Sequence, residues 1–118
     1  MSKPAGKIVI AGGSGFLGQA LAASLLADGY EVVVLSRNNQ RGLTGRFVKW
    51  DAQNLDSWSQ QLSGSLALFN LAGRSIDCRY TQKNKQLILN SRLASTQVLG
   101  EAIKRCDDPP KVWLNAST

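Results

Sequence analysis

The chain has 118 residues, a formal charge of +6 at pH 7 and no histidine. Its length predicts one small domain over residues 1–118, and the lack of histidine excludes a Ser-His-Asp or Cys-His nucleophile and a histidine-ligated metal from this chain. No signal peptide is recognisable and no apolar run approaches the ~20 residues that span a bilayer, so we expect a cytoplasmic protein without a membrane partner.

The first part of the chain predicts a βαβ unit. Residues 7–11 are an apolar run typical of a strand, and residues 15–27 repeat apolar side chains at helical spacing. Asp28-Gly29 ends this helix, because glycine tolerates the left-handed conformation of a helix C-terminus. Residues 31–36, EVVVLS, form a β-branched run of the kind that parallel sheets bury on both faces.

The middle of the chain is less regular. A polar loop with glycines is predicted over residues 37–45, followed by a shorter third strand at 46–50 near the edge of the sheet. A short helix is predicted over 54–62, with Asn54 or Asp51 as its cap.

The last part of the chain predicts two more strands around a long helix. Residues 65–71, SLALFNL, are typical of a strand, and residues 80–105 contain no proline and one glycine, which favours one continuous helix. The prolines at 109–110 end that helix, and residues 111–117 predict the fifth strand.

Alternating strands and helices imply parallel pairing with right-handed crossovers. The fold class is therefore α/β: a Rossmann-type doubly wound parallel sheet of five strands in the order 3-2-1-4-5. Ligands of such sheets bind where the order reverses, beyond the C-terminal ends of strands 1 and 4. Residues 12–18, 71–73 and 115–118 are predicted to meet there.

Three glycines spaced three apart follow the first strand and open the first helix. This pattern allows a tight turn, close approach of backbone N–H groups to a pyrophosphate and close packing of helix on sheet, and so predicts dinucleotide binding. The alternative is a packing turn without a ligand. The residues predicted to contact the cofactor here are Gly12, Ser14, Gly15, Phe16, Leu17 and Gly18.

The exit of the second strand favours NADP over NAD. An acidic residue there binds the ribose 2′-hydroxyl of NAD, whereas an arginine accommodates the 2′-phosphate of NADP. Here the strand ends in Ser36 and Arg37, with Arg41 in the following loop. Glu31 begins the strand, about 16 Å from the cleft at ~3.3 Å per residue, and is too distant. The alternative is that Arg37 is only a solvated cation.

Further contacts are predicted along the same edge. Asp51 could reach the adenine or cap the following helix, and the small turn of Leu71, Ala72 and Gly73 would let a nicotinamide ribose pass closely. Arg92, inside the long helix, meets a phosphate or carboxylate if it faces the cleft and has no specific role if it faces solvent.

One candidate catalytic residue is present without its usual partners. Ser117, ahead of Thr118, could polarise a carbonyl at the end of the fifth strand. The general acid/base of such chemistry is usually a tyrosine with a lysine one helical turn later. This sequence contains no Tyr-x-x-x-Lys, since Asn84 follows Tyr80 at that spacing.

Charge and cysteines add no second site. The basic residues are thickest between Arg74 and Arg92, which favours a solvated helix face over nucleic-acid binding. Cys78 and Cys106 follow no metal-ligand spacing, so we expect free thiols and no metal.

Six segments together carry a family resemblance. They are AGGSGFLG, LSR, Trp50-Asp51, NLAG at 70–73, SRLASTQVLGEAI and PPKVWLNAS. The chain resembles the extended or atypical short-chain dehydrogenase/reductases, specifically their NAD-dependent epimerase/dehydratase branch, which contains nucleoside-diphosphate-sugar epimerase-like proteins.

The resemblance implies an NADP(H)-binding domain acting with a sugar-nucleotide or another small carbonyl or alcohol substrate. It implies that Ser36 and Arg37 hold the 2′-phosphate, that Leu71, Ala72 and Arg92 lie along the cofactor, and that Ser117 matches the active-site hydroxyl. Family members continue well beyond this length, so we expect cofactor binding without complete catalysis; the alternative is a non-catalytic NADP-sensing or interaction module. We also expect Val112 and Trp113 to be partly exposed and the chain to self-associate as a homodimer.

Overall fold

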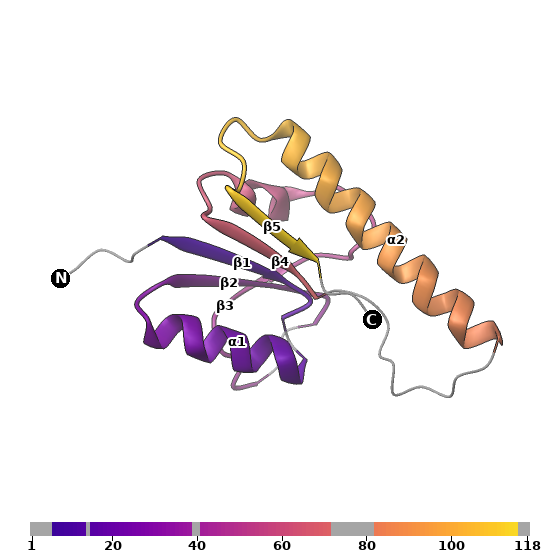
Figure 1. Cartoon of the computed structure of the whole chain (residues 1–118), viewed down its shortest axis with the longest axis horizontal. Coiled ribbons are helices and arrows are strands. Elements are labelled where there is room, and N and C mark those ends of the chain that lie inside the picture. The colour runs from indigo at the N-terminus through magenta and orange to yellow at the C-terminus, as the bar shows by residue number, and fades with distance from the viewer. Residues whose placement is uncertain (1–5, 14, 39–40, 72–81, 116–118) are drawn as a thin grey trace.

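The structure is a computed structural model that describes residues 6–13, 15–38, 41–71 and 82–115; within 82–92 it describes the helix but not the side chains. The chain alternates between strands and helices (Figure 1). Its elements are β1 (Lys7–Ala11), α1 (Phe16–Ala27), β2 (Glu31–Ser36), β3 (Arg46–Lys49), the 3₁₀ helix η1 (Ser57–Leu62), β4 (Ala67–Asn70), α2 (Gln82–Arg105) and β5 (Val112–Asn115).

The five strands form one parallel sheet in the order β3-β2-β1-β4-β5. The predicted fold class and strand order are confirmed. Ile10 of β1 pairs with Val34 of β2 on one side and with Phe69 of β4 on the other. The order therefore reverses at β1, and ligands of such sheets bind beyond the C-terminal ends of the two strands at this point, here β1 and β4.

Helices cover both faces of the sheet, with α1 on one side and α2 on the other (Figure 1). Because successive side chains of a strand point to opposite faces, β1 divides its residues between two cores. Val9 and Ala11 pack in the cluster that includes Leu99 of α2, whereas Ile8 and Ile10 pack in the cluster that includes Ala22 of α1. Among the described residues, no helix is long and apolar enough to cross a membrane.

The connection between β3 and β4 differs from the predicted helix over 54–62. The structure has only η1, and its N-cap is Asp56, whose carboxylate accepts a hydrogen bond from the Ser57 N–H at 2.7 Å. Trp58 is buried edge-to-face against Trp50, with ring centroids 5.2 Å apart. The buried indole of Trp58 therefore lies in a 3₁₀ helix and not in the α-helix that the spacing of apolar residues had indicated.

The partial exposure predicted at β5 is confirmed for Val112 and for Trp113, which is only partly buried. Val112 and Leu114 are 48% and 50% exposed, whereas Trp113 packs against the core cluster beneath α2. Neighbouring residues of a strand cannot share a face, so Val112 groups with Leu114 rather than with Trp113. The predicted self-association through this strand therefore concerns Val112 and Leu114.

Gly100, inside α2, tests how closely that helix packs on β5. A Cβ added to Gly100 would lie 3.6 Å from Cη2 of Trp113, an ordinary van der Waals contact. We expect Gly100→Ala to raise the free energy of unfolding by about 0.5–1 kcal/mol, because alanine costs less backbone entropy than glycine in a helix. Urea denaturation measures this change.

Gly29→Ala is the matched control. The Cβ of this variant would meet no described atom within 4 Å, so it causes no clash either, but Gly29 has a φ of +91°. We expect it to lower stability by about 1 kcal/mol or more, because an L-residue is strained in that conformation. A loss of stability in Gly100→Ala would contradict the packing of Trp113 described here.

Candidate functional site

The carboxyl ends of the central strands are tied together by backbone hydrogen bonds. The Gly12 N–H donates to the Leu35 carbonyl of β2, and the Leu71 N–H donates to the Ala11 carbonyl of β1, both at 2.8 Å. The Trp50 N–H donates to the Ser36 carbonyl at 3.1 Å. These bonds hold the exits of β3, β2, β1 and β4 at one edge, as the sequence predicted for strands 1 and 4.

The turn after β1 has no room for side chains. Gly12 has a φ of +75°, which favours glycine. A Cβ at Gly18 would lie 2.6 Å from Cα of Gly13, and one at Gly13 would lie 2.9 Å from Cγ1 of Val34. The helix therefore packs directly on the backbone of the turn. The sequence analysis missed Gly13, although its place directly after Gly12 was a signal.

The N-terminus of α1 faces this edge without a side-chain cap. Gly15 is the N-cap in extended conformation, and no acidic residue lies in the first turn. Phe16 and Leu17 are 94% and 65% exposed, and a Cβ at Gly15 would meet nothing within 4 Å. The first N–H groups of a helix have no intrahelical partner and carry its positive dipole end. This arrangement fits an anionic group such as a pyrophosphate.

The exit of β2 presents one buried hydroxyl and one exposed cation. Ser36 is buried, and its Oγ donates a hydrogen bond to the Asn38 carbonyl at 3.0 Å. Arg37 is exposed, as is Arg41 farther along the connection to β3. Glu31 lies at the opposite end of β2, paired with Lys7. The charge at this exit is therefore the positive charge of Arg37.

Asp51 caps its own turn. Its carboxylate accepts hydrogen bonds from the Asn54 and Gln53 N–H groups, both at 2.8 Å, and from Nδ2 of Asn54 at 2.7 Å. The same turn holds Ala52 at a φ of +64°. These hydrogen bonds, that from the Asn54 N–H first, lower the pKa of Asp51 from its ordinary value of 3.8. The predicted cap of the following helix, at Asn54 or Asp51, is wrong, because η1 is capped by Asp56; Asp51 instead closes the turn that precedes η1.

A polar group links the exits of β4 and β5. Nδ2 of Asn70 donates to Oδ1 of Asn115 at 3.0 Å and to Oγ1 of Thr96, on α2, at 3.3 Å. Asn70 is buried, directly before Leu71. The sequence analysis did not single out Asn70, because its partners lie 45 and 26 residues away.

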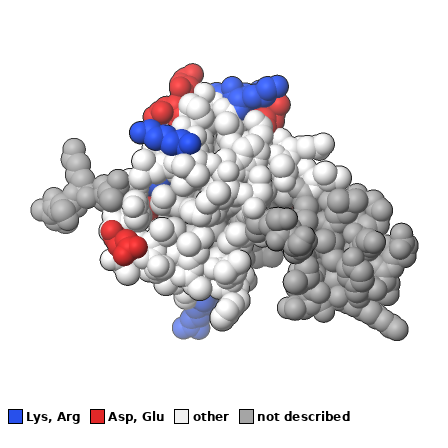
Figure 2. Space-filling view, viewed as in Figure 1, with Lys and Arg blue, Asp and Glu red and all other residues white. Residues whose placement is uncertain are grey.

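Several predicted site residues fall beyond what the structure describes. Ser14, Ala72, Gly73 and Ser117 lie outside the described residues, and for Arg92 only the helix is described. The basic run from Arg74 to Arg92 is likewise not described at side-chain level. Elsewhere, basic and acidic side chains lie next to one another over the end of α2 (Figure 2), where Arg105 pairs with Glu101 at 3.1 Å.

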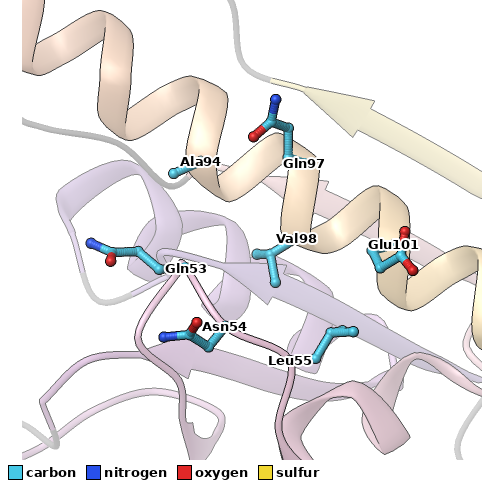
Figure 3. Close-up of a pocket in the computed structure, with 7 residues that line it drawn as sticks. All are labelled: Gln53, Asn54, Leu55, Ala94, Gln97, Val98 and Glu101. Atoms are coloured by element: carbon cyan, nitrogen blue, oxygen red, sulfur yellow. The ribbon is translucent and has the colours of Figure 1, made fainter.

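A pocket of about 420 Å³ lies on the α2 side, next to the turn that Asp51 caps. The loop after β3 supplies one wall and α2 the other (Figure 3). Its lining residues are Gln53, Asn54, Leu55, Ala94, Gln97, Val98 and Glu101. This pocket contains none of the predicted cofactor-binding residues.

Comparisons with known proteins identify the same kind of fold. The model of the family described as "NAD dependent epimerase/dehydratase family" matches residues 8–118. The Epimerase family protein YfhF of Bacillus subtilis is 38% identical over 114 residues, which are 93% of this chain and 37% of YfhF.

Two solved structures are also similar. The human epimerase family protein SDR39U1, solved with NADPH, is 35% identical with a TM-score of 0.70, over 92% of this chain and 35% of that one. The UDP-N-acetylglucosamine 4-epimerase from Bacillus cereus is 27% identical with a TM-score of 0.71, over 95% of this chain and 35% of that one. The chain thus spans about a third of the length of these relatives.

The cap formed by Asp51 predicts a pH-dependent contribution to stability. We expect Asp51→Ala to be less stable than the wild type at neutral pH, because the charged carboxylate no longer holds the turn. A lowered pKa contributes stability above the unfolded-state pKa, and this contribution is lost as pH falls through the pKa of the folded chain. Urea denaturation of both proteins, at neutral pH and in steps into acid, should show the difference shrinking below the ordinary pKa of 3.8.

A carbon-13 titration of the Asp51 carboxyl group checks the cause. An apparent pKa at or above the ordinary value would contradict the cap.

Proposed function

The chain belongs to the NAD dependent epimerase/dehydratase family, and we propose that residues 1–118 form the NADP(H)-binding domain of an epimerase- or oxidoreductase-like protein. The family binds a nicotinamide cofactor. The observation that carries the proposal is the uncapped N-terminus of α1 above a turn that only glycine fits. The open space at Gly15 supports this assignment, because no described residue fills it.

In this proposal the residues have separate tasks. The turn after β1 and the first turn of α1 bind the pyrophosphate through their N–H groups. Asp51 orders the turn beside the adenine, and the exit of β4 follows the nicotinamide ribose. The residues proposed to hold the cofactor are Gly12, Ser14, Gly15, Phe16, Leu17, Gly18, Ser36, Arg37, Asp51, Leu71, Ala72, Gly73 and Arg92.

The preference for NADP(H) rests on the charge at the exit of β2. Arg37 is exposed there, and Glu31 begins the strand at the other end. An arginine at this position pairs with a 2′-phosphate, whereas NAD requires a hydrogen-bond acceptor for its 2′-hydroxyl. The similar human SDR39U1, which was solved with NADPH, supports the choice of NADP(H) as the proposed cofactor.

The proposed chemistry depends on residues of a longer protein. A bound nicotinamide exchanges a hydride with a substrate carbon, and Ser117 would donate a hydrogen bond to the reacting oxygen. The similar UDP-N-acetylglucosamine 4-epimerase supports a sugar-nucleotide as substrate, and another small carbonyl or alcohol compound is the alternative. We expect these 118 residues alone to bind cofactor without turnover, since no tyrosine in them is followed by lysine four residues later.

The same sequence feature favours a second candidate, a non-catalytic NADP-sensing or interaction module. The two candidates differ in whether a longer protein that contains these residues carries the tyrosine and lysine pair. Such a pair would support the enzyme, and turnover by the longer protein would exclude the sensor.

Calorimetric titration with NADPH and NADH tests the proposed cofactor. We expect the wild type to prefer NADPH and Arg37→Ala to lose about tenfold to a hundredfold in NADPH affinity, because a charge-assisted hydrogen bond to phosphate is removed. Its NADH affinity should change little. Ionic strength must be fixed, since salt screens such contacts.

The matched control is Arg105→Ala. Arg105 is also exposed, but it lies at the end of α2 in a pair with Glu101. This variant should bind both nucleotides as the wild type does. Equal wild-type affinity for NADPH and NADH would overturn the NADP preference, and no binding of either would overturn the proposed function.

A further inference from the structure

The side chain of Gln19 joins two segments that are distant in sequence. It lies in the first turns of α1, partly buried. Its Nε2 donates to the Gly13 carbonyl at 2.8 Å and to the Thr44 carbonyl at 3.2 Å. Its Oε1 accepts from the Thr44 N–H at 2.7 Å. Gln19 thus connects the glycine turn to the end of the β2–β3 connection.

The pattern uses the whole amide group. A glutamine amide has two N–H donors and one carbonyl acceptor, and here both donors meet carbonyl oxygens while the acceptor meets an N–H. The reversed amide would place its oxygen against two carbonyl oxygens. Gln19 pairs with the donor and the acceptor of Thr44 as a neighbouring strand would, so it fixes the backbone of Thr44 in both directions.

Both segments that Gln19 joins are otherwise closely constrained. Gly13 lies against Gly18, the residue before Gln19, with no space for a Cβ. After Thr44, Gly45 has a φ of +96°, and a Cβ there would lie 2.9 Å from Cγ2 of Val34. Movement of Gln19 would therefore disturb both the turn at Gly13 and the backbone at Thr44.

The β2–β3 connection is the segment that carries the exposed cations Arg37 and Arg41. The Ser36 hydroxyl secures its start through the Asn38 carbonyl, and Gln19 secures its end through Thr44. Leu43, beside Thr44, packs against the core on the α1 side. Among the described side chains, that of Gln19 joins this connection to the glycine turn by hydrogen bonds.

We propose that Gln19 is a positioning residue for cofactor preference: it holds the β2–β3 connection at a set position relative to the glycine turn, so that one ligand engages both. This inference rests on the proposed function, because it assigns the pyrophosphate to the turn and the 2′-phosphate to the connection. A dinucleotide with a 2′-phosphate would contact both the glycine turn and the β2–β3 connection, whereas one without it would contact mainly the turn. Preorganising the two places lowers the ordering cost of binding for the first ligand more than for the second.

The test replaces Gln19 with methionine, an unbranched side chain of similar length that suits a helix but makes none of the three hydrogen bonds. We expect Gln19→Met to lose about tenfold in NADPH affinity and much less in NADH affinity. The ratio of NADPH affinity to NADH affinity should therefore fall. Gln97→Met is the matched control, because Gln97 is an exposed glutamine of α2. It should leave both affinities unchanged.

Hydrogen exchange of the Thr44 amide provides a readout without cofactor. The Thr44 N–H donates to Gln19, so we expect its exchange to accelerate in Gln19→Met and not in Gln97→Met. Gln19→Glu is a second variant, because it keeps the acceptor for Thr44 but removes the donors. Its second carboxylate oxygen would face the Gly13 and Thr44 carbonyl oxygens, so we expect Gln19→Glu to lose the NADPH preference as Gln19→Met does.

The outcomes separate this inference from the proposed function. If the wild type binds neither nucleotide, the proposed function fails, and the inference that rests on it fails as well. If the wild type prefers NADPH and Gln19→Met keeps the same preference, the inference alone is overturned. An equal loss for both nucleotides would also overturn it, since Gln19 would then only support the turn.

Discussion

The contact between Gly18 and the backbone of Gly13 is the constraint on which the site depends. A Cβ at Gly18 would lie 2.6 Å from Cα of Gly13, so no other residue fits without movement of the backbone. This contact brings the start of α1 against the exit of β1, at the position where the strand order reverses. The uncapped N–H groups at the start of α1 consequently lie at the edge where β1 and β4 end.

Around this contact, polar side chains add to the backbone hydrogen bonds at the exits of β2, β3, β4 and β5. Ser36 binds the carbonyl of Asn38 after β2, Asp51 caps the turn after β3, and Asn70 links the ends of β4 and β5. Loops lack the regular hydrogen bonds of a sheet, so such side chains determine their shape. A cofactor that binds at an edge already ordered in this way loses less free energy to the ordering of its site.

The region that the family model matches contains the features on which the proposed cofactor binding rests. The matched region covers residues 8–118, and these correspond to about a third of the similar proteins. Within this region lie the glycine turn and the cation of Arg37.

The sequence by itself determined the parallel sheet, its strand order and the glycine turn. These features follow from local signals: apolar runs of strand length, helical spacing and glycines between a strand and a helix. Local signals also placed Arg37 at the exit of β2, because the β-branched run that begins at Glu31 ends at Ser36.

Only the tertiary structure decided which side chains meet. Gln19 and Thr44 are 25 residues apart, and Asn70 and Asn115 are 45 apart, so no local pattern could indicate either contact. The same holds for the side of the sheet on which Trp113 lies: its contact with the core cluster under α2 follows from the register of β5 with β4, which local spacing does not indicate. Sequence periodicity reports the element that a residue belongs to, whereas contacts between elements depend on how the completed sheet orients them.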